Sequence, residues 1–234
     1  MAGKDSLVPP QHKHAALLVL LLASIAIQSF DARGAATGAL SDVFRIVLGL
    51  TIFFVVFHQA RERAGMAVII VTALAIGVAR HFASGEVNYV LSLVFHALMA
   101  LFLWVTVWVI LRGLFRTPTV GAENVLGAVC GYLIAGNAWA DVNALTYLLV
   151  PAAYSINPEV NLLLADWQGR QALFSYYSLA QMLTIGYSDV TPIRAPATTL
   201  SLFAALFGMF YTAIVVSQLV GMAQSRRSRG HGDE

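Results

Sequence analysis

Apolar runs separated by short polar stretches fill most of the chain. Because a helix needs about 20 residues to cross the hydrocarbon core of a bilayer, we predict transmembrane helices at residues 15–30, 43–59, 66–79, 90–111, 125–150 and 195–223. A seventh run, at residues 171–183, is too short to cross and long enough to enter the membrane and return. The pattern predicts an all-α membrane protein with six transmembrane helices and one re-entrant helix.

Two of the six runs are shorter than a typical span. Residues 15–30 follow a lysine and precede small residues, so they share features with a secretory signal, and we interpret them as a retained span. Residues 66–79 also fit an interfacial segment by length. We count residues 66–79 as a span because the charges of the loops then agree with a single orientation.

The lysines and arginines predict that both termini are cytoplasmic, because cytoplasmic loops carry an excess of these residues. In this orientation the inside segments hold Lys4, Lys13, Arg61, Arg63, Arg112, Arg116, Arg226, Arg227 and Arg229. The outside segments hold Arg33, Arg45, Arg80, Arg170 and Arg194. The loop that follows the re-entrant helix then lies on the outer side of a cell membrane, plasma or inner.

The amino-acid composition reduces the number of protein classes to consider. Of the 234 residues, 59% are hydrophobic and 11% are charged, whereas a soluble domain carries about 25% charged residues. The formal net charge of +2 gives no reason to expect a nucleic-acid partner. A single cysteine, Cys130, excludes an intrachain disulfide. The sequence has no H-E-x-x-H, G-x-S-x-G or P-loop motif, so we do not expect an enzyme.

The polar loop after the re-entrant run, Thr184 to Asp189, is the most informative stretch. It reads T-I-G-Y-S-D and lies between two apolar helical runs. Non-helical backbone at membrane depth is tolerated only where it is buried in protein or lines a water-filled path. A row of carbonyl oxygens with one hydroxyl is able to replace the water shell of a small cation.

This loop and its flanks resemble the pore of the tetrameric potassium channels, whose filter usually reads Thr-Val-Gly-Tyr-Gly-Asp. Here Ile185 replaces the valine and Ser188 replaces the second glycine. The resemblance runs from about residue 123 to residue 222. It also rests on an aromatic pair that we expect to open the pore helix, on a proline after the filter and on a glycine in the last helix, namely Tyr176, Tyr177, Pro192 and Gly208. The first half of the chain carries no comparable resemblance.

The resemblance implies a domain plan. It predicts a cytoplasmic N-terminal tail (1–14), a four-helix peripheral region (15–118), a pore domain (119–223) and a cytoplasmic C-terminal tail (224–234). Within the pore domain it implies an outer helix, an exposed turret at 151–169, a pore helix at 171–183, a filter at 184–189 and an inner helix at 195–223.

It also implies roles for the site residues. Four chains, a homotetramer, would bind K⁺ with the carbonyls of each filter and the Thr184 hydroxyl, and K⁺ is the only ion or cofactor expected. The carbonyls are those of Thr184, Ile185, Gly186 and Tyr187. Support of the filter falls to Asp189 at the outer mouth, to Tyr177 beside Tyr187, and to Gln181 as a hydrogen-bond partner. Gly208 is either a hinge or a packing glycine, and Thr212, Val216 and Val220 are expected to line the inner cavity or its gate.

Two features leave the ion selectivity and the gating stimulus undecided at this point. Ser188 has a Cβ that disfavours positive φ by roughly 1 kcal/mol, so a weakly selective or Na⁺-permeable channel is the alternative to a K⁺ channel. The run 90–111 contains no arginine repeat, so we predict no conventional voltage gating.

Two alternatives come from other classes of protein. One is a non-conducting accessory subunit of another channel. The other is a haem-binding membrane protein, because His58, His81 and His96 are candidate axial ligands. Asp141, the one acidic residue deep in a predicted span, is either functional or hydrogen-bonded near the outer end of its helix.

Overall fold

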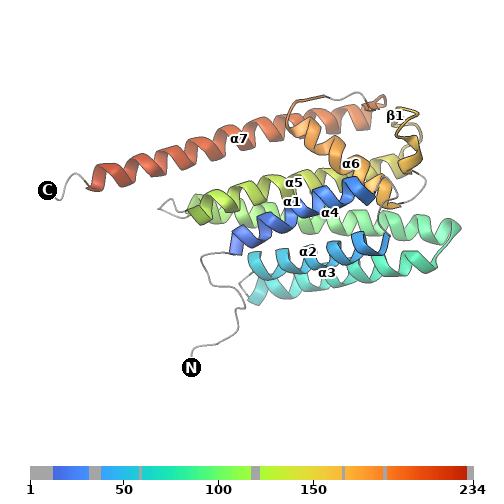
Figure 1. Ribbon diagram of the computed structural model, residues 1–234, viewed down its shortest axis with the longest axis horizontal. Coiled ribbons are helices and arrows are strands. Elements are labelled where there is room, and N and C mark those ends of the chain that lie inside the picture. Colours follow the sequence, from blue (N-terminus) through green and yellow to red (C-terminus); the bar gives the residue numbers. More distant parts are fainter. Residues whose placement is uncertain are drawn as a thin grey trace.

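The structure, a computed structural model, describes residues 13–31, 38–57, 60–116, 122–164, 167–186 and 189–230. Its long helices lie side by side, with α7 along one edge and α2 and α3 along the opposite edge (Figure 1). The beginning of α1 and the end of α7 lie at the same end of the molecule, and α6 and β1 gather toward the other (Figure 1). The helices are α1 (Lys13–Asp31), α2 (Gly38–Val56), α3 (Ala60–Ala79), α4 (Gly85–Arg116), α5 (Ala122–Leu149), α6 (Trp167–Met182) and α7 (Ala195–Gly230).

The helices confirm an all-α membrane protein. Four of the described helices are long and apolar enough to cross a membrane, at Arg63–Phe82, Gly85–Arg116, Glu123–Leu149 and Ala195–Gln218. The apolar parts of α1 and α2, His14–Ile27 and Phe44–Val56, are shorter. The six-span layout therefore stays a prediction for these first two helices. Each predicted apolar run contains a helix, but the ends differ. The helices α2, α5 and α6 end before the predicted Gln59, Val150 and Leu183, and α4 and α7 extend well beyond the predicted ends.

The region between α5 and α7 differs from the prediction. Residues 151–169 are expected to form an exposed turret, but β1 (Tyr154–Ile156) pairs antiparallel with β2 (Val190–Pro192), so that Ser155 lies opposite Thr191. Ala153 and Tyr154 are buried. The pairing joins segments far apart in the sequence, so the local pattern gives no sign of it. A short 3-10 helix, η3 (Asn161–Leu164), follows β1.

The re-entrant helix α6 also begins earlier than predicted, at Trp167 and not at Gln171. The prediction ended the turret at Gly169 because residues 167–170 are not an apolar run. In the structure this first turn is covered by side chains from other helices, as described below. Tyr176 and Tyr177 consequently lie in the second half of α6, whereas the sequence suggested that they open it.

The core has two main parts that meet on α5. One fills the space between the peripheral helices and α5, with Ile52, Ile70, Phe102 and Ile134 almost fully buried. The other lies at the end of the molecule near the strands and consists mainly of Ala140, Ala144, Tyr154, Phe174, Tyr177 and Val190. Small residues of α5 let neighbouring helices approach closely in lipid. The helix α5 is thereby the common wall of the peripheral region and the pore half.

Candidate functional site

The loop that leaves α6 turns sharply through two left-handed residues. Thr184 has φ +55° and Gly186 has φ +68°. The turn is closed by backbone hydrogen bonds from Thr184 N to Gln181 O and from Ile185 N to Ala180 O, both 2.9 Å long. Glycine adopts positive φ without strain, whereas a threonine there costs about 1–2 kcal/mol. The loop therefore holds a conformation that its surroundings have to stabilise.

The same loop is exposed on the single chain. Met182, the last residue of α6, is 2% exposed, but Ile185 is 51% exposed and Thr184 and Gly186 are also open. The fold thus buries much of the helix that leads to the loop and leaves residues 184–186 uncovered. Tyr187 and Ser188 lie outside the described residues, so the positions predicted for them stay predictions.

The far side of the loop is held by the turret. Asn157 N donates to Asp189 O at 2.9 Å, immediately before the β1–β2 pairing begins. The Tyr176 hydroxyl of α6 donates to Asp189 Oδ2 over a longer 3.4 Å. The expected acidic residue after the filter is therefore tied to both the turret and the pore helix. Gln181 contributes its backbone carbonyl to the turn described above.

A buried network of uncharged polar groups links α6 to its neighbours α5, β1 and α7. Asn143 Nδ2 of α5 donates to Ser178 Oγ at 2.9 Å, and the Tyr154 hydroxyl donates to Asn143 Oδ1 at 2.8 Å. The Tyr177 hydroxyl meets Ser201 Oγ of α7. Burial raises the pKa of the Tyr154 phenol above its usual value, so this group stays a neutral donor.

Sequence reasoning missed Asn143, Ser178 and Tyr154 as parts of the site. The available signal was a polar residue in each of two apolar runs, since such groups in a membrane need a partner. The signal did not say which partner, because the residues are 35 positions apart in the case of Asn143 and Ser178.

Gly208 of α7 lies directly against the end of α6. A Cβ built at this position would overlap the carbonyl oxygen of Met182, which is backbone and therefore unable to rotate away. The Thr212 hydroxyl donates to Gly208 O at 2.9 Å. Val216 and Val220, the other predicted lining residues, are about half exposed on the single chain at 51% and 50%.

The peripheral region contacts the pore half through a buried pair of polar side chains. His96 Nδ1 of α4 lies 2.8 Å from Asp141 Oδ1 of α5, and the two residues are 1% and 2% exposed. Asp141 is therefore hydrogen-bonded inside the protein. His96, one of the three candidate haem ligands, has this ring nitrogen engaged. Of the other two, His81 is exposed and His58 lies outside the described residues.

Within the described ranges, no group of three or more His, Cys, Asp or Glu side chains is arranged to hold a metal ion.

A second contact surrounds Trp167, the first residue of α6. The guanidinium carbons of Arg45 and Arg80 lie 5.1 Å and 4.9 Å from the indole centroid. The rings of His81 and Phe95 lie 6.0 Å and 6.4 Å away. We call these five residues the Trp167 cluster. Such cation–π contacts gain strength when they are shielded from water.

The Trp167 cluster corrects the interpretation of two charges. Arg45 and Arg80 are predicted as charges of outer loops, but Arg80 is only 4% exposed and Arg45 is half-buried. Both guanidinium groups fold onto aromatic rings of the protein, and Arg80 also covers Phe95 at 4.9 Å. Counting charges by segment therefore missed that these two side chains point inward.

A third contact reaches α7 directly. Trp104 of α4 packs edge-on against Trp139 of α5 at 5.3 Å and against Phe207 of α7 at 5.2 Å. Phe207 is the neighbour of Gly208 in the chain. The peripheral helix α4 thus contacts the helix that supports the end of α6.

Comparison with known proteins gives one match. Residues 152–225, which are less than half of the chain, match a family model described as "Ion channel". The match includes the turret, α6, the loop and most of α7, and it indicates an ion channel. No curated protein and no solved structure matches this chain.

Proposed function

We propose that four copies of this chain form a potassium-selective channel around the loop 184–189. The observation that carries the proposal is the exposure of Thr184, Ile185 and Gly186 on the single chain. Open backbone polar groups at membrane depth are costly unless protein or a water-filled path surrounds them. A ring of four such loops removes that cost and encircles an ion, which one loop is unable to do.

In the proposed pore, the carbonyl oxygens of residues 184–187 and the Thr184 hydroxyl replace the hydration shell of K⁺. The left-handed conformation of Gly186 supports this arrangement, because a ribbon whose carbonyls all face one axis alternates between the two hands. The C-terminus of α6 carries about half a negative charge from its helix dipole. In a tetramer four such ends would favour a cation below the filter.

The contacts around the loop supply the rigidity that such a filter needs. A binding geometry has to be held within about 0.5 Å by packed and hydrogen-bonded neighbours. Here the Asn143–Ser178 and Tyr154–Asn143 hydrogen bonds, the β1–β2 pairing and the close packing at Gly208 act together on α6 and on both ends of the loop.

The peripheral helices have a positioning role in this proposal. They carry no arginine repeat in α4, and they contact the pore helix through the Trp167 cluster and α5 through His96. We propose a multi-pass protein of the cell membrane with both termini cytoplasmic, gated by something other than membrane potential.

Recording from the purified chain in a planar bilayer, with K⁺ on one side and Na⁺ on the other, tests the proposal. We expect currents that reverse close to the K⁺ equilibrium potential and that Gly186→Ala abolishes, since alanine is strained at φ +68°. Gly113→Ala on α4 is the control, because a Cβ there meets no atom within 4 Å. Reversal near zero rejects potassium selectivity. Silence of the unmodified chain favours an accessory subunit.

Ser188 provides the test of the weakly selective alternative. If its Cβ loosens the outermost ion site, Ser188→Gly raises the preference for K⁺ over Na⁺ in the same recording. If the unmodified chain already excludes Na⁺ and the variant does not differ from it, Ser188 does not limit selectivity.

A further inference from the structure

A cavity of about 80 Å³ lies between the peripheral helices, α5 and the first turns of α6. Since one water needs ~10–15 Å³ of such space, the cavity corresponds to roughly five to eight water-sized positions. Along α2 it runs from Arg45 to Ile52, which is about 10 Å of helix. The cavity is therefore elongated and has room for a short chain of atoms.

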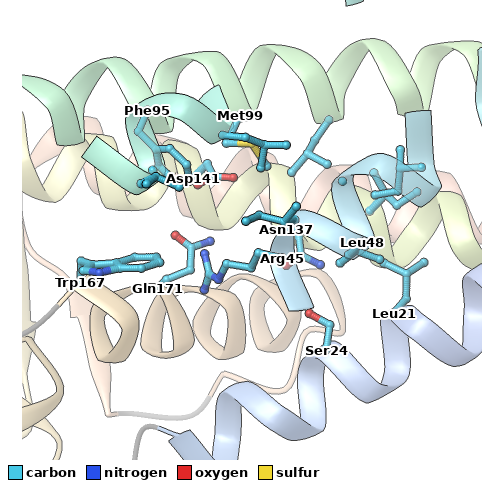
Figure 2. Close-up of a pocket in the computed structure, with 18 of the residues that line it drawn as sticks. Leu21, Ser24, Arg45, Leu48, Phe95, Met99, Asn137, Asp141, Trp167 and Gln171 are labelled. Atoms are coloured by element: carbon cyan, nitrogen blue, oxygen red, sulfur yellow. The ribbon is translucent and has the colours of Figure 1, made fainter. Parts of the chain in front are cut away.

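The two ends of the cavity differ in polarity. The inner walls are apolar and come from four helices, with Leu21, Ile52, Leu103 and Ile134 among the lining residues. These walls offer a buried water none of the two to four polar partners that it usually has. Figure 2 shows the polar end, where Gln171 of α6 lies across the space from Asp141 of α5. A molecule that fits both ends has one polar group and an apolar body.

The cavity reaches the protein surface at its polar end. Val78 of α3 and His81, just after α3, both line it, and both are exposed. The His81 ring lies 6.0 Å from the ring of Trp167, which lines the polar end (Figure 2). A ligand would therefore enter with its apolar part first and leave its polar group near this opening, beside Gln171.

Gln171 indicates which polar group the cavity accepts. The residue is 3% exposed, lines the cavity and points into it from α6 (Figure 2). Its Oε1 atom has no hydrogen-bond partner among the described residues. This amide oxygen is an acceptor, and a buried acceptor without a donor destabilises the protein. The group that would complete the site is therefore an O–H or N–H donor from outside the chain.

The apolar walls favour a donor without charge, because burying a charge costs far more than burying a hydroxyl. An ammonium group would bring three donors to a single amide oxygen, whereas a hydroxyl brings one. The carboxylate of Asp141 also lines the cavity, but its Oδ1 is already engaged by His96. An anionic head group would bring only acceptors and would place oxygen against oxygen. The hydroxyl thus matches Gln171 Oε1 one to one.

We propose that this cavity binds a neutral short-chain alcohol. Its hydroxyl donates to Gln171 Oε1, and its alkyl chain lies against Ile52, Leu103 and Ile134. A lipid with full-length acyl chains is too large for this volume. The bound alcohol contacts α2, α4, α5 and α6 at once, so it connects the peripheral region to the helix that carries the filter loop. Its effect on conduction rests on the proposed channel function, whereas its binding does not.

Photolabelling of the full chain in lipid nanodiscs tests the site, with a hexan-1-ol that carries a diazirine on its alkyl chain and with mass spectrometry to identify the labelled residues. We expect labelling of cavity-lining residues that excess hexan-1-ol abolishes. 1-Methoxyhexane keeps the oxygen but has no O–H, so at equal concentration in the bilayer it should compete at least fivefold less well. Equal competition by the ether, or labelling only of residues outside the cavity, overturns the proposal.

Charged analogues of the same chain length test the class of ligand. Hexanoate and hexylammonium should each compete at least tenfold less well than hexan-1-ol. Hexylammonium that competes as well as hexan-1-ol overturns the neutral class and assigns the polar end to a cation near Asp141. Hexanoate that competes as well as hexan-1-ol overturns the requirement for a donor.

A pair of variants tests the partner of the hydroxyl. Gln171→Leu removes the amide oxygen with little change in volume and should abolish the difference between the alcohol and the ether. Asn137→Leu is the matched control, because Asn137 also lines the cavity and its Nδ2 donates to Leu133 O. This control should keep the difference, and an equal effect of the two variants overturns the assignment to Gln171. The comparison of alcohol and ether on the unmodified chain does not depend on the folding of either variant.

Currents separate this proposal from the proposed function. If hexan-1-ol binds as expected and changes the K⁺ current of the unmodified chain but not that of Gln171→Leu, both stand. Labelling of the cavity that depends on Gln171, in a chain that conducts no ion, rejects the channel and keeps the site. Normal K⁺ currents without labelling that hexan-1-ol displaces reject the site and keep the channel.

Discussion

The two ends of α6 are held by different kinds of polar contact. Inside the protein its second half is held by uncharged groups, through Ser178, Asn143 and Tyr154, and its bond to the acidic Asp189 is long and exposed. Its first turn is surrounded by charged groups of the peripheral region, Arg45 and Arg80, stacked on Trp167. The nearby His96–Asp141 pair, which joins α4 to α5, also consists of ionisable side chains.

The two kinds of contact are expected to respond differently to pH and to substitution. Uncharged hydrogen bonds near the loop do not titrate around neutral pH, so they keep the same geometry when conditions change. Buried ionisable partners are more sensitive, because removing one of them leaves the other without compensation. We therefore expect the loss of the buried partner His96 to cost the most stability, substitutions in the uncharged network to change selectivity, and substitutions in the Trp167 cluster to change gating.

The largest loss of stability is expected for His96→Leu, which leaves Asp141 buried without its partner. Breaking such a pair costs about 3 kcal/mol or more, and thermal unfolding of the purified protein measures it. The double variant His96→Leu/Asp141→Leu should recover much of the loss. A double variant that is no more stable than the single one would show that the pair does not behave as a unit.

Gly208→Ala is expected to come next, at about 2 kcal/mol, because its Cβ would overlap the backbone oxygen of Met182. The shift that relieves this overlap has to move the end of α6, so K⁺ current should be lost as well. Gly221→Ala on the same helix meets no atom within 4 Å and serves as the control. Normal current through Gly208→Ala would contradict the close packing.

Asn143→Leu tests the uncharged network and should lower stability by about 1–2 kcal/mol, because Ser178 and Tyr154 each lose a partner. The sharper effect should be a reduced preference for K⁺ over Na⁺. Asn137→Leu is the matched control on the same helix, since Asn137 bonds only to Leu133 O of its own turn among the described contacts. Equal selectivity in the two variants would remove the distinction drawn above.

Trp167→Leu should have the smallest effect on stability, about 1 kcal/mol, through the loss of two cation–π contacts. Because it releases the first turn of α6, we expect the open probability of the channel to change with little change in selectivity. Trp108→Leu, at a position that is 66% exposed on α4, controls for the loss of an indole. A change in selectivity without a change in gating would reverse the roles assigned to the two ends of α6.

The sequence predicted the features that depend only on residues close together in the chain. Apolar runs located every long helix, and the stretch T-I-G-Y-S-D located the loop, because hydropathy and a short motif need no knowledge of distant partners. The pairing of Tyr154 with Pro192, of Asn143 with Ser178 and of His96 with Asp141 joins positions far apart in the chain. A single sequence contains each partner but not the pairing.

Arg80 shows a second limit of prediction. Its charge and its place at the end of a helix are those of an ordinary loop residue, and only the arrangement of Phe95 and Trp167 around it explains its burial. Trp167, which Arg80 contacts, is also the residue at which α6 begins, one turn before its apolar run.

The close backbone contact between Met182 and Gly208 restricts how such a channel would open. Since one backbone lies on another with no side chain between them, α7 cannot bend toward α6 at this level, and bending away would uncover the end of α6. A gate that works by bending α7 and keeps the end of α6 covered would need its hinge in the stretch that follows Thr212. Otherwise the filter loop itself would open and close the pathway, and α7 would stay in place.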